Sequence, residues 1–256
     1  MTMRRPRLIP VLLIDRGDLI KTINFKEVTY LGDPINAIKI FNEKEVDELC
    51  VIDRSASEHG IDYKLLREIA DEAFMPLSYG GGIKDADDAV NILKIGFEKI
   101  IVNEHNFVSF QLVEDIAKRV GNQSVIVSID YKMSWLKKRV CVYRQAKQMT
   151  KIDPLTHALE AVKHGAGEIL LTSVAHEGVM KGFDVEFVKT VSDAASVPVI
   201  AHGGAGTLED VRQVIYDYGA SAVAVGSMFV YYGKKKGILI NYPELEELMQ
   251  EGVYRR

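Results

Sequence analysis

The fold is decided by the stretch Val199-Ile-Ala-His-Gly-Gly-Ala-Gly206, an apolar run that ends in a glycine turn. An amphipathic segment opens directly afterwards with Thr207-Leu-Glu-Asp210. Such a turn leaves backbone N–H groups free beside the start of a helix, where they can bind an anion. Half a chain earlier, the same pattern occurs in Leu77-Ser-Tyr-Gly-Gly-Gly-Ile83. The two turns predict a duplicated half-barrel with two phosphate sites.

Short apolar runs rich in β-branched residues recur along the whole chain, with helical patterns such as 63–70 and 209–218 between them. Most runs are apolar on both faces, which is typical of parallel strands covered by helices. The runs are 8–14, 49–52, 77–79, 100–102, 125–129, 169–171, 197–201 and 222–225. Strand and helix alternating in this way predict an α/β fold, a (βα)8 TIM barrel.

An internal repeat supports two related half-barrels. The segment 48–60, which begins Glu48-Leu-Cys-Val-Ile-Asp53, is echoed by 168–178, which begins Glu168-Ile-Leu-Leu-Thr-Ser173. Linker-like and low-complexity segments do not divide the sequence. We therefore expect a single domain over residues 1–256.

Composition excludes several functional classes. With 256 residues, 47% of them hydrophobic, the chain can bury the core of one αβ barrel. The net charge of −4 and the dispersed basic residues argue against a nucleic-acid partner. Cys50 and Cys141 have no disulfide or metal spacing, so a reduced cytoplasm is expected. Asp15 and Arg16 stop the first apolar run, so we expect neither a signal peptide nor a membrane span.

Catalytic and binding residues of TIM barrels lie on the top face, at the carboxyl ends of the strands. That rule selects Asp53, 80–82, Asn103, Asp130, 172–173, 202–206 and 226–227. Four charged residues instead occur where strands begin, at the barrel floor: Arg7, Glu48, Lys99 and Glu168. From spacing alone, they read either as solubilising edge charges or as a salt-bridged ring that closes the floor.

Several longer motifs point to one family. They are Lys21-Thr-Ile-Asn-Phe25, Gly32-Asp-Pro34, Gly121-Asn-Gln-Ser124, Gly165-Ala-Gly-Glu-Ile-Leu-Leu-Thr-Ser173 and Gly203-Gly-Ala-Gly206. On these motifs the chain resembles, essentially end to end, the cyclase subunit of imidazole glycerol phosphate synthase. In that family a glutaminase subunit docks on the barrel floor, and ammonia passes through the barrel to the top face.

The resemblance gives the floor charges a function. Arg7, Glu48, Lys99 and Glu168 match the family's ring at the tunnel entrance, and Glu98 falls where an acidic residue holds the glutaminase. A heterodimer with a glutaminase subunit is therefore implied, with the ring as an ammonia gate. Ammonia remains a nucleophile only while it is neutral, and a closed barrel provides a dry path.

The resemblance also implies ligand-binding residues and no metal or cofactor. Gly82 and Asn103 would bind one phosphate, and the other would be bound by Glu177, Gly178, Gly204, Gly226 and Ser227. The implied substrate contacts are Lys21, Asp53, Thr172 and His202. Glu104, Glu177 and His202 depart from the family residues, which are threonine, aspartate and serine. The first phosphate site is the more altered, so a single phosphate or a nucleotide-type diphosphate is an alternative to two separated phosphates.

The family chemistry depends on two aspartates, at the tips of the first and fifth strands, which can act as general acid and general base. Asp130 matches the fifth-strand residue, but Leu13 stands at the first-strand position and cannot transfer a proton. Asp15 is a possible substitute, because residues two apart in a strand face the same side. It would lie about 6–7 Å further along the strand.

Three functions remain open. We favour a paralogue associated with surface-polysaccharide synthesis, which would conduct ammonia for amidation of a sugar while a third protein forms the amide. Leu13, the altered first phosphate site and the segment 41–49 resemble that group. The alternative is a true cyclase-lyase of histidine biosynthesis that acts on the phosphorylated ribulosyl-formimino carboxamide ribotide. A non-catalytic subunit that only activates a glutaminase is the third. Trp135, after the fifth strand, reads either as the tip of a lid or as a plain hairpin hydrophobe.

Overall fold

The computed structural model describes residues 5–233 and 237–255, so the basic cluster 234–236 lies outside the described part of the chain. Within these residues, eight parallel strands form a barrel: β1 (Arg7–Asp15), β4 (Leu49–Asp53), β5 (Leu77–Gly80), β6 (Lys99–Val102), β7 (Val125–Met133), β10 (Glu168–Ser173), β11 (Val199–His202) and β12 (Ala222–Val225). β1 pairs with both β4 and β12, and β7 pairs with both β6 and β10, so the ring is closed. The predicted (βα)8 barrel is confirmed.

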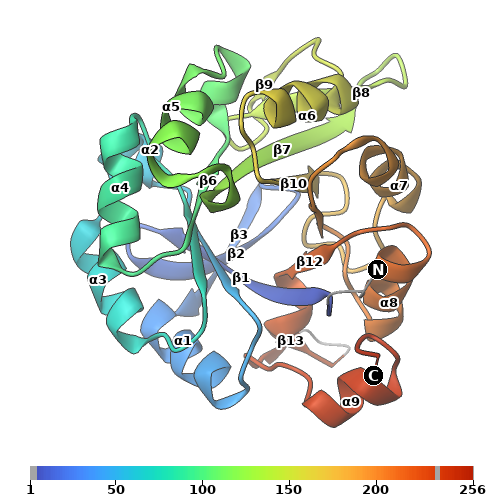
Figure 1. Cartoon of the computed structure of the whole chain (residues 1–256). Coiled ribbons are helices and arrows are strands. Elements are labelled where there is room, and N and C mark those ends of the chain that lie inside the picture. Colours follow the sequence, from blue (N-terminus) through green and yellow to red (C-terminus); the bar gives the residue numbers. More distant parts are fainter. Residues whose placement is uncertain (1–4, 234–236, 256) are drawn as a thin grey trace.

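Helices cover the outside of the barrel (Figure 1). They are α1 (Pro34–Glu43), α2 (Ala56–His59), α3 (Tyr63–Glu72), α4 (Ala86–Ile95), α5 (Gln111–Val120), α6 (Pro154–Lys163), α7 (Val185–Ala194), α8 (Leu208–Tyr216) and α9 (Leu245–Gln250). Several begin at a side chain that accepts a hydrogen bond from the first turn, and Thr207 and Asp210 form a complete capping box at α8. Such caps satisfy N–H groups that a helix start leaves without partners.

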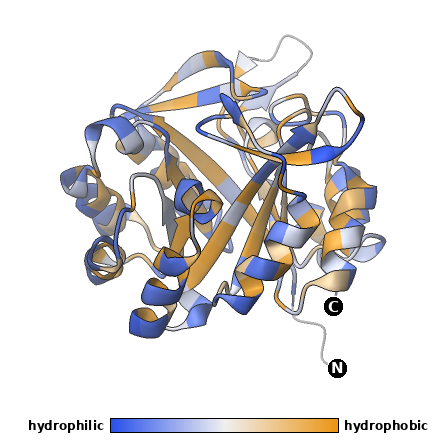
Figure 2. Ribbon diagram, turned by 90° about the horizontal axis from the view of Figure 1, so that it is seen from above, coloured by the Kyte–Doolittle hydropathy of each residue, from blue (hydrophilic) through white to orange (hydrophobic). Residues whose placement is uncertain are grey.

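The barrel has two apolar layers, one inside the strands and one between strands and helices. The inner layer consists of Ile9, Val11, Cys50, Ile101, Ile126, Leu170, Ile200, Ala222 and Ala224. The outer layer is larger and takes in the apolar faces of the helices. Figure 2 shows the mostly apolar central strands. Because side chains alternate across a strand, both layers come from the same short runs.

Each half of the barrel carries an extra hairpin after its first strand. β2 (Asp18–Ile23) and β3 (Glu27–Gly32) follow β1, whereas β8 (Arg139–Tyr143) folds back on β7 and pairs with β9 (Gln148–Met149). This shared position agrees with the half-barrel repeat. A shorter pair, β13 (Tyr231–Tyr232) and β14 (Gly237–Ile238), follows β12. Trp135 lies in the turn between β7 and β8 with 84% of its surface exposed, which fits a hairpin tip.

Both cysteines are free and buried, Cys50 in the inner layer and Cys141 in the outer one. Across the described residues, every helix is too short or too polar to span a bilayer.

Candidate functional site

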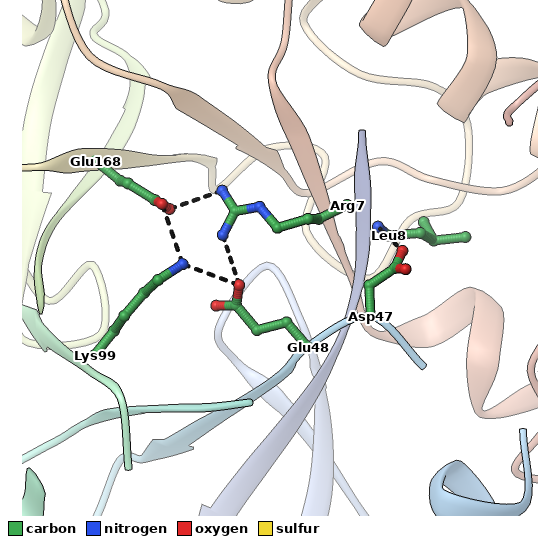
Figure 3. Close-up of polar contacts among 6 residues, drawn as sticks. All are labelled: Arg7, Leu8, Asp47, Glu48, Lys99 and Glu168. Atoms are coloured by element: carbon green, nitrogen blue, oxygen red, sulfur yellow. Dashed lines mark hydrogen bonds and ion pairs between the residues drawn. The ribbon is translucent and has the colours of Figure 1, made fainter. Parts of the chain in front are cut away.

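Four charged side chains close the floor of the barrel in a ring of alternating sign (Figure 3). Arg7 lies 2.5 Å from a Glu48 oxygen and 2.9 Å from a Glu168 oxygen. Lys99 Nζ completes the ring, at 3.0 Å from Glu48 and 3.1 Å from Glu168. The residues come from the starts of β1, β6 and β10 and from the position before β4. The structure therefore assembles the four predicted gate residues at one end of the barrel.

The ring is neutral in sum and largely shielded from solvent. Glu48 is the most enclosed member, with 4% of its side chain exposed, and Arg7 is the least, with 25%. Burial opposes the charge of Arg7, but Glu168 and Glu48 outweigh that effect and raise its pKa. The second oxygen of Glu48, Oε1, is buried and has no hydrogen-bond partner among the described residues. The ring therefore has an unused acceptor.

Asp47 fixes the strand starts beside the ring. It accepts a hydrogen bond from the backbone N–H of Leu8 at 3.1 Å (Figure 3). It also accepts one from the Tyr254 hydroxyl and forms an ion pair with Arg5 at 3.0 Å. Arg5 also lies over the Tyr254 ring. Glu98, the residue expected to hold a glutaminase, is exposed next to Lys99. The floor around the ring is thus braced from both ends of the described chain.

At the other end of the barrel, polar side chains form an arc across four neighbouring strands. Asn103 follows β6, and Asp130, Thr172 and His202 lie on β7, β10 and β11. In the parallel ladder, Thr172 is the direct neighbour of both Asp130 and His202. The Asn103 amide donates to an Asp130 oxygen at 3.1 Å, and Thr172 Oγ1 lies 3.3 Å from His202 Nδ1. We call the opening above this arc the mouth.

The environment of the arc shifts two titrating groups toward their neutral forms. Burial raises the pKa of Asp130 to about 7, although hydrogen bonds from Thr172 and Asn103 oppose this rise. Burial and the nearby Lys21 ammonium lower the pKa of His202 to about 3, so this imidazole is neutral at physiological pH. Asp130 is therefore poised to exchange a proton near neutrality.

A cleft opens beside His202, at the site predicted for the second phosphate. Its lining consists of Lys21, Gly178, Met180, 202–205 and 224–227. A Cβ atom at Gly226 would lie 2.4 Å from Lys21 Nζ, so glycine there lets the ammonium group approach the backbone. Ser227 Oγ is buried without a partner among the described residues. Backbone N–H groups, a hydroxyl and an ammonium group around one cleft suit an oxyanion.

Lys21 is held in the cleft by Glu177. The two form an ion pair of 3.3 Å, and both side chains are at most 4% exposed. Glu177 also accepts from the Thr22 hydroxyl and from the backbone N–H of Phe25, both at 2.9 Å. Its carboxylate therefore fastens the β2–β3 hairpin, and Glu177 is not among the cleft-lining residues. The expected phosphate contact of Glu177 stays a prediction.

The opposite side of the mouth is bridged by the β8–β9 turn. Gln145 accepts from the Arg54 side chain at 2.6 Å and donates to its carbonyl at 3.2 Å. Arg144 lies 2.5 Å from Glu104. The turn thus ties the loops after β4, β6 and β7 together over the first predicted phosphate site. Glu104 is therefore ion-paired with Arg144, so its negative charge beside the first predicted phosphate site is compensated.

Two residues expected at the mouth are engaged by their own loops. Asp53 Oδ1 accepts from the N–H and hydroxyl of Ser55 and from the N–H of Ala56, at 2.6–3.1 Å. This carboxylate therefore shapes the β4–α2 turn, and its expected contact with substrate stays a prediction. Gly82 has a φ of +67°, and a Cβ atom there would lie 2.6 Å from the Ala56 carbonyl oxygen. Glycine is therefore required at this position by the close approach of the Ala56 backbone, in addition to any role in binding an anion.

Leu13 lies on the inner face of β1, where the family resemblance expects an aspartate. Asp15 is at the end of the same strand, 31% exposed, and ion-paired with Arg54 at 3.6 Å. Arg16 lies 3.9 Å from the same carboxylate. Asp15 is thus held at the outer lip by two arginines, so its geometry does not favour the substitute role. Asp130 is the carboxylate of the arc.

A family model described as histidine biosynthesis protein matches residues 7–236. The match includes every barrel strand from β1 to β12. The chain belongs to the histidine biosynthesis protein family.

Relatives in the histidine biosynthesis protein family match nearly the full length. A Leptospira interrogans protein provisionally named imidazole glycerol phosphate synthase subunit HisF is 46% identical over 96% of this chain and 98% of that protein. The Pseudomonas aeruginosa protein provisionally named subunit hisF2 is 43% identical over 96% and 99%. Subunit HisF of imidazole glycerol phosphate synthase from Hyphomonas neptunium is 37% identical over 89% and 90%.

Sequence reasoning missed the residues that restrain the mouth of this histidine biosynthesis family member. Arg54, Arg144 and Gln145 were not singled out, although they bridge three loops. Arginine directly after Asp53 was the only available signal. Among the described residues, no three His, Cys, Asp or Glu side chains converge to hold a metal ion.

Proposed function

We propose that this chain is the synthase subunit of a glutamine amidotransferase complex and conducts ammonia through its barrel. A glutaminase subunit would bind the floor as a heterodimer partner, near Glu98. Ammonia would enter at the charged ring and reach the mouth. There it would serve the amidation of a phosphorylated sugar or nucleotide sugar by a third protein. The two buried free cysteines and the absence of a bilayer-spanning helix in the described residues are compatible with a cytoplasmic protein.

The single observation that carries the proposal is the closed ring of Arg7, Glu48, Lys99 and Glu168 beneath an apolar interior. Four charges pointing into a barrel floor add little to stability, because desolvation offsets much of their attraction. They make sense as a polar constriction that excludes bulk water and ions. The free Glu48 Oε1 could accept an N–H from a passing ammonia molecule.

The conduit function is preferred to cyclase chemistry because of the first strand. Leu13 cannot carry a proton, and Asp15 is paired with Arg54 and Arg16 at the lip. The bridged first phosphate site also disfavours a ligand with two separated phosphates. Relatives with 41–46% identity have provisional names, two of them numbered hisF2 and hisF3. Relatives with the unqualified name have 37%, and a Campylobacter jejuni protein with the provisional name hisF2 has 36%. The numbered names among these relatives agree with a paralogue.

One observation favours the alternative, a true cyclase-lyase of histidine biosynthesis. The pKa of Asp130 is raised to about 7, which suits a general acid or base. The test supplies the purified chain with ammonium salt and the phosphorylated ribulosyl-formimino carboxamide ribotide. We expect no turnover above that of Asp130→Asn. Turnover that Asp130→Asn abolishes would contradict the conduit proposal and support the cyclase.

The conduit itself is tested at the ring in the complex with glutaminase. Lys99→Met should lower glutamine-dependent product formation while ammonium-dependent product formation is kept, because only the first route crosses the floor. Lys118→Met, which removes an exposed lysine on α5, is the matched control. Equal losses with both nitrogen sources, or no loss, would count against the gate. Activation of the glutaminase without any transfer of its ammonia would instead indicate the non-catalytic activating subunit.

A further inference from the structure

His202 lies between two groups of opposite character at the mouth. On one side, its Nδ1 is 3.3 Å from Thr172 Oγ1, and Thr172 in turn donates to Asp130. On the other side, His202 and Lys21 line the same cleft. A hydroxyl has one proton to donate. If Thr172 gives it to an ionised Asp130, its oxygen accepts from His202 Nδ1–H, and His202 Nε2 is left as an unprotonated acceptor.

The side chains that line the cleft supply little net positive charge with which to bind an anion. Among the described lining residues, Lys21 is the one lysine or arginine, and it is already ion-paired with Glu177. The imidazole of His202 is neutral, because burial and Lys21 lower its pKa to about 3. The backbone of Gly204 and Gly226, which line the cleft, and the Ser227 hydroxyl, which has no partner among the described residues, add dipoles but no charge. The positive charge of the cleft would therefore not balance the charge of a bound dianion.

We propose that His202 takes up one proton when a phosphate- or sulfate-type anion fills this cleft, and that its Nε2–H then donates to the anion. The inference rests on the proposed function only in taking the cleft as the anion site. The proton comes from solvent, and the only covalent bond that forms is N–H. An anion beside an imidazole favours the imidazolium form, and a charge-assisted hydrogen bond stabilises the pair.

The hydroxyl of Thr172, which bridges His202 and Asp130, stabilises the protonated form of the His202 ring. In the charged form both ring nitrogens donate. Nδ1–H donates to Thr172 Oγ1, whose own proton is directed to Asp130. With the anion at Nε2–H, both N–H groups of the imidazolium then have a hydrogen-bond acceptor. The groups that face His202 are Lys21 from the β2–β3 hairpin, Thr172 from β10 and, through these, Glu177 and Asp130. Asp130 also titrates near neutrality and needs its own control.

The experiment measures sulfate binding to the purified chain by isothermal titration calorimetry between pH 5.5 and 8, in buffers of different ionisation enthalpy. Sulfate is used because it stays a dianion throughout this range. We expect uptake of up to one proton per sulfate. We also expect affinity to rise as pH falls, by up to about tenfold per pH unit where the proton is bound only in the complex.

Three variants assign the proton. His202→Gln should bind sulfate with a pH-independent affinity, whereas Asp130→Asn should keep the proton uptake. His176→Gln removes a histidine that bonds Ser173 outside the cleft lining, and should match the wild type. Sulfate binding without proton uptake would overturn the inference and leave the anion site intact. Proton uptake that persists in His202→Gln and vanishes in Asp130→Asn would overturn it in favour of Asp130. An absence of sulfate binding at every pH would overturn the anion site itself, and this inference with it.

Discussion

Lys21 and Glu177 form a buried ion pair of 3.3 Å that joins the β2–β3 hairpin to the loop after β10. The two residues are far apart in sequence, and each supplies the buried counter-charge of the other. Because this pair places an ammonium group in the cleft, it connects the stability of the hairpin to the function of the mouth.

Glu177→Gln should lower the free energy of unfolding by about 3 kcal/mol, because it leaves the Lys21 ammonium buried without a counter-charge. The amide can still accept from Thr22 and Phe25, so the fold should persist. Urea denaturation followed by far-UV circular dichroism measures the change. Glu68→Gln, in an exposed pair with Lys64 on α3, is the control and should change stability little. Equal effects of the two variants would show that burial of the pair is energetically unimportant.

Asp130→Asn should stabilise the protein at pH 8 relative to the wild type and have little effect near pH 4. The folded protein raises the pKa of Asp130 to about 7, above the ordinary value near 3.9 of an unfolded chain. The native state therefore binds the additional proton between these values, and the contribution present below pH 4 is lost as pH rises through 7. The difference between the two pH values should be roughly 2–4 kcal/mol.

Urea unfolding of both proteins at each pH checks this prediction, since every other titrating group is shared.

His202→Gln should show the opposite pH dependence of the free energy of unfolding. The pKa of His202 is lowered to about 3, so the wild type loses stability as pH falls below 6.5 while the variant does not. A pH-independent difference for either variant would mean that the side chain is not enclosed as described.

Gly226→Ala should weaken sulfate binding by at least tenfold, and it should also lower the free energy of unfolding because Lys21 would leave its buried pair with Glu177. The new methyl group would lie 2.4 Å from Lys21 Nζ, and the flexible lysine would move out of the cleft to accommodate it. Gly237→Ala is the control, because the nearest atom to its Cβ is 3.8 Å away. Calorimetric titration with sulfate at pH 6 distinguishes the two. Unchanged affinity in Gly226→Ala would exclude Lys21 as an anion ligand.

Ala146→Gly should raise the free energy of unfolding by about 0.5 kcal/mol. Arg144, Gln145 and Ala146 have φ values of 52°, 58° and 59°, in the left-handed region that disfavours side chains. Glycine relieves that cost at Ala146, although it also increases the entropy of the unfolded chain. The urea midpoint reports the sum. A lower stability than the wild type would mean that the turn does not adopt this conformation in solution.

Much of the fold could be predicted because the barrel strands are apolar on both faces. Even the small error at β11 has a local cause. The run was expected at 197–201, but Pro198 has no N–H to give to a sheet, and the strand spans Val199–His202. The β2–β3 hairpin was harder to predict because Lys21–Phe25 was used only as a family motif and the exposed residues of β3 resemble a loop.

Side-chain direction at the mouth could not be obtained from residue type. Asp53 and Glu177 lie at the predicted level of the barrel, yet their carboxylates are used by neighbouring backbone and hydroxyl groups. Which of several donors a carboxylate meets depends on loop conformation, which short motifs do not specify. The left-handed turn at Arg144–Ala146 lacks the glycine that normally announces such a conformation.

Trp135 has a practical consequence for spectroscopy of this protein. It is the sole tryptophan of the sequence, and it lies at a hairpin tip with 84% of its surface in water. Intrinsic indole fluorescence will therefore be almost blind to melting of the interior. The same emission should report whatever approaches the rim of the top face, so the chain carries a natural optical probe at that position.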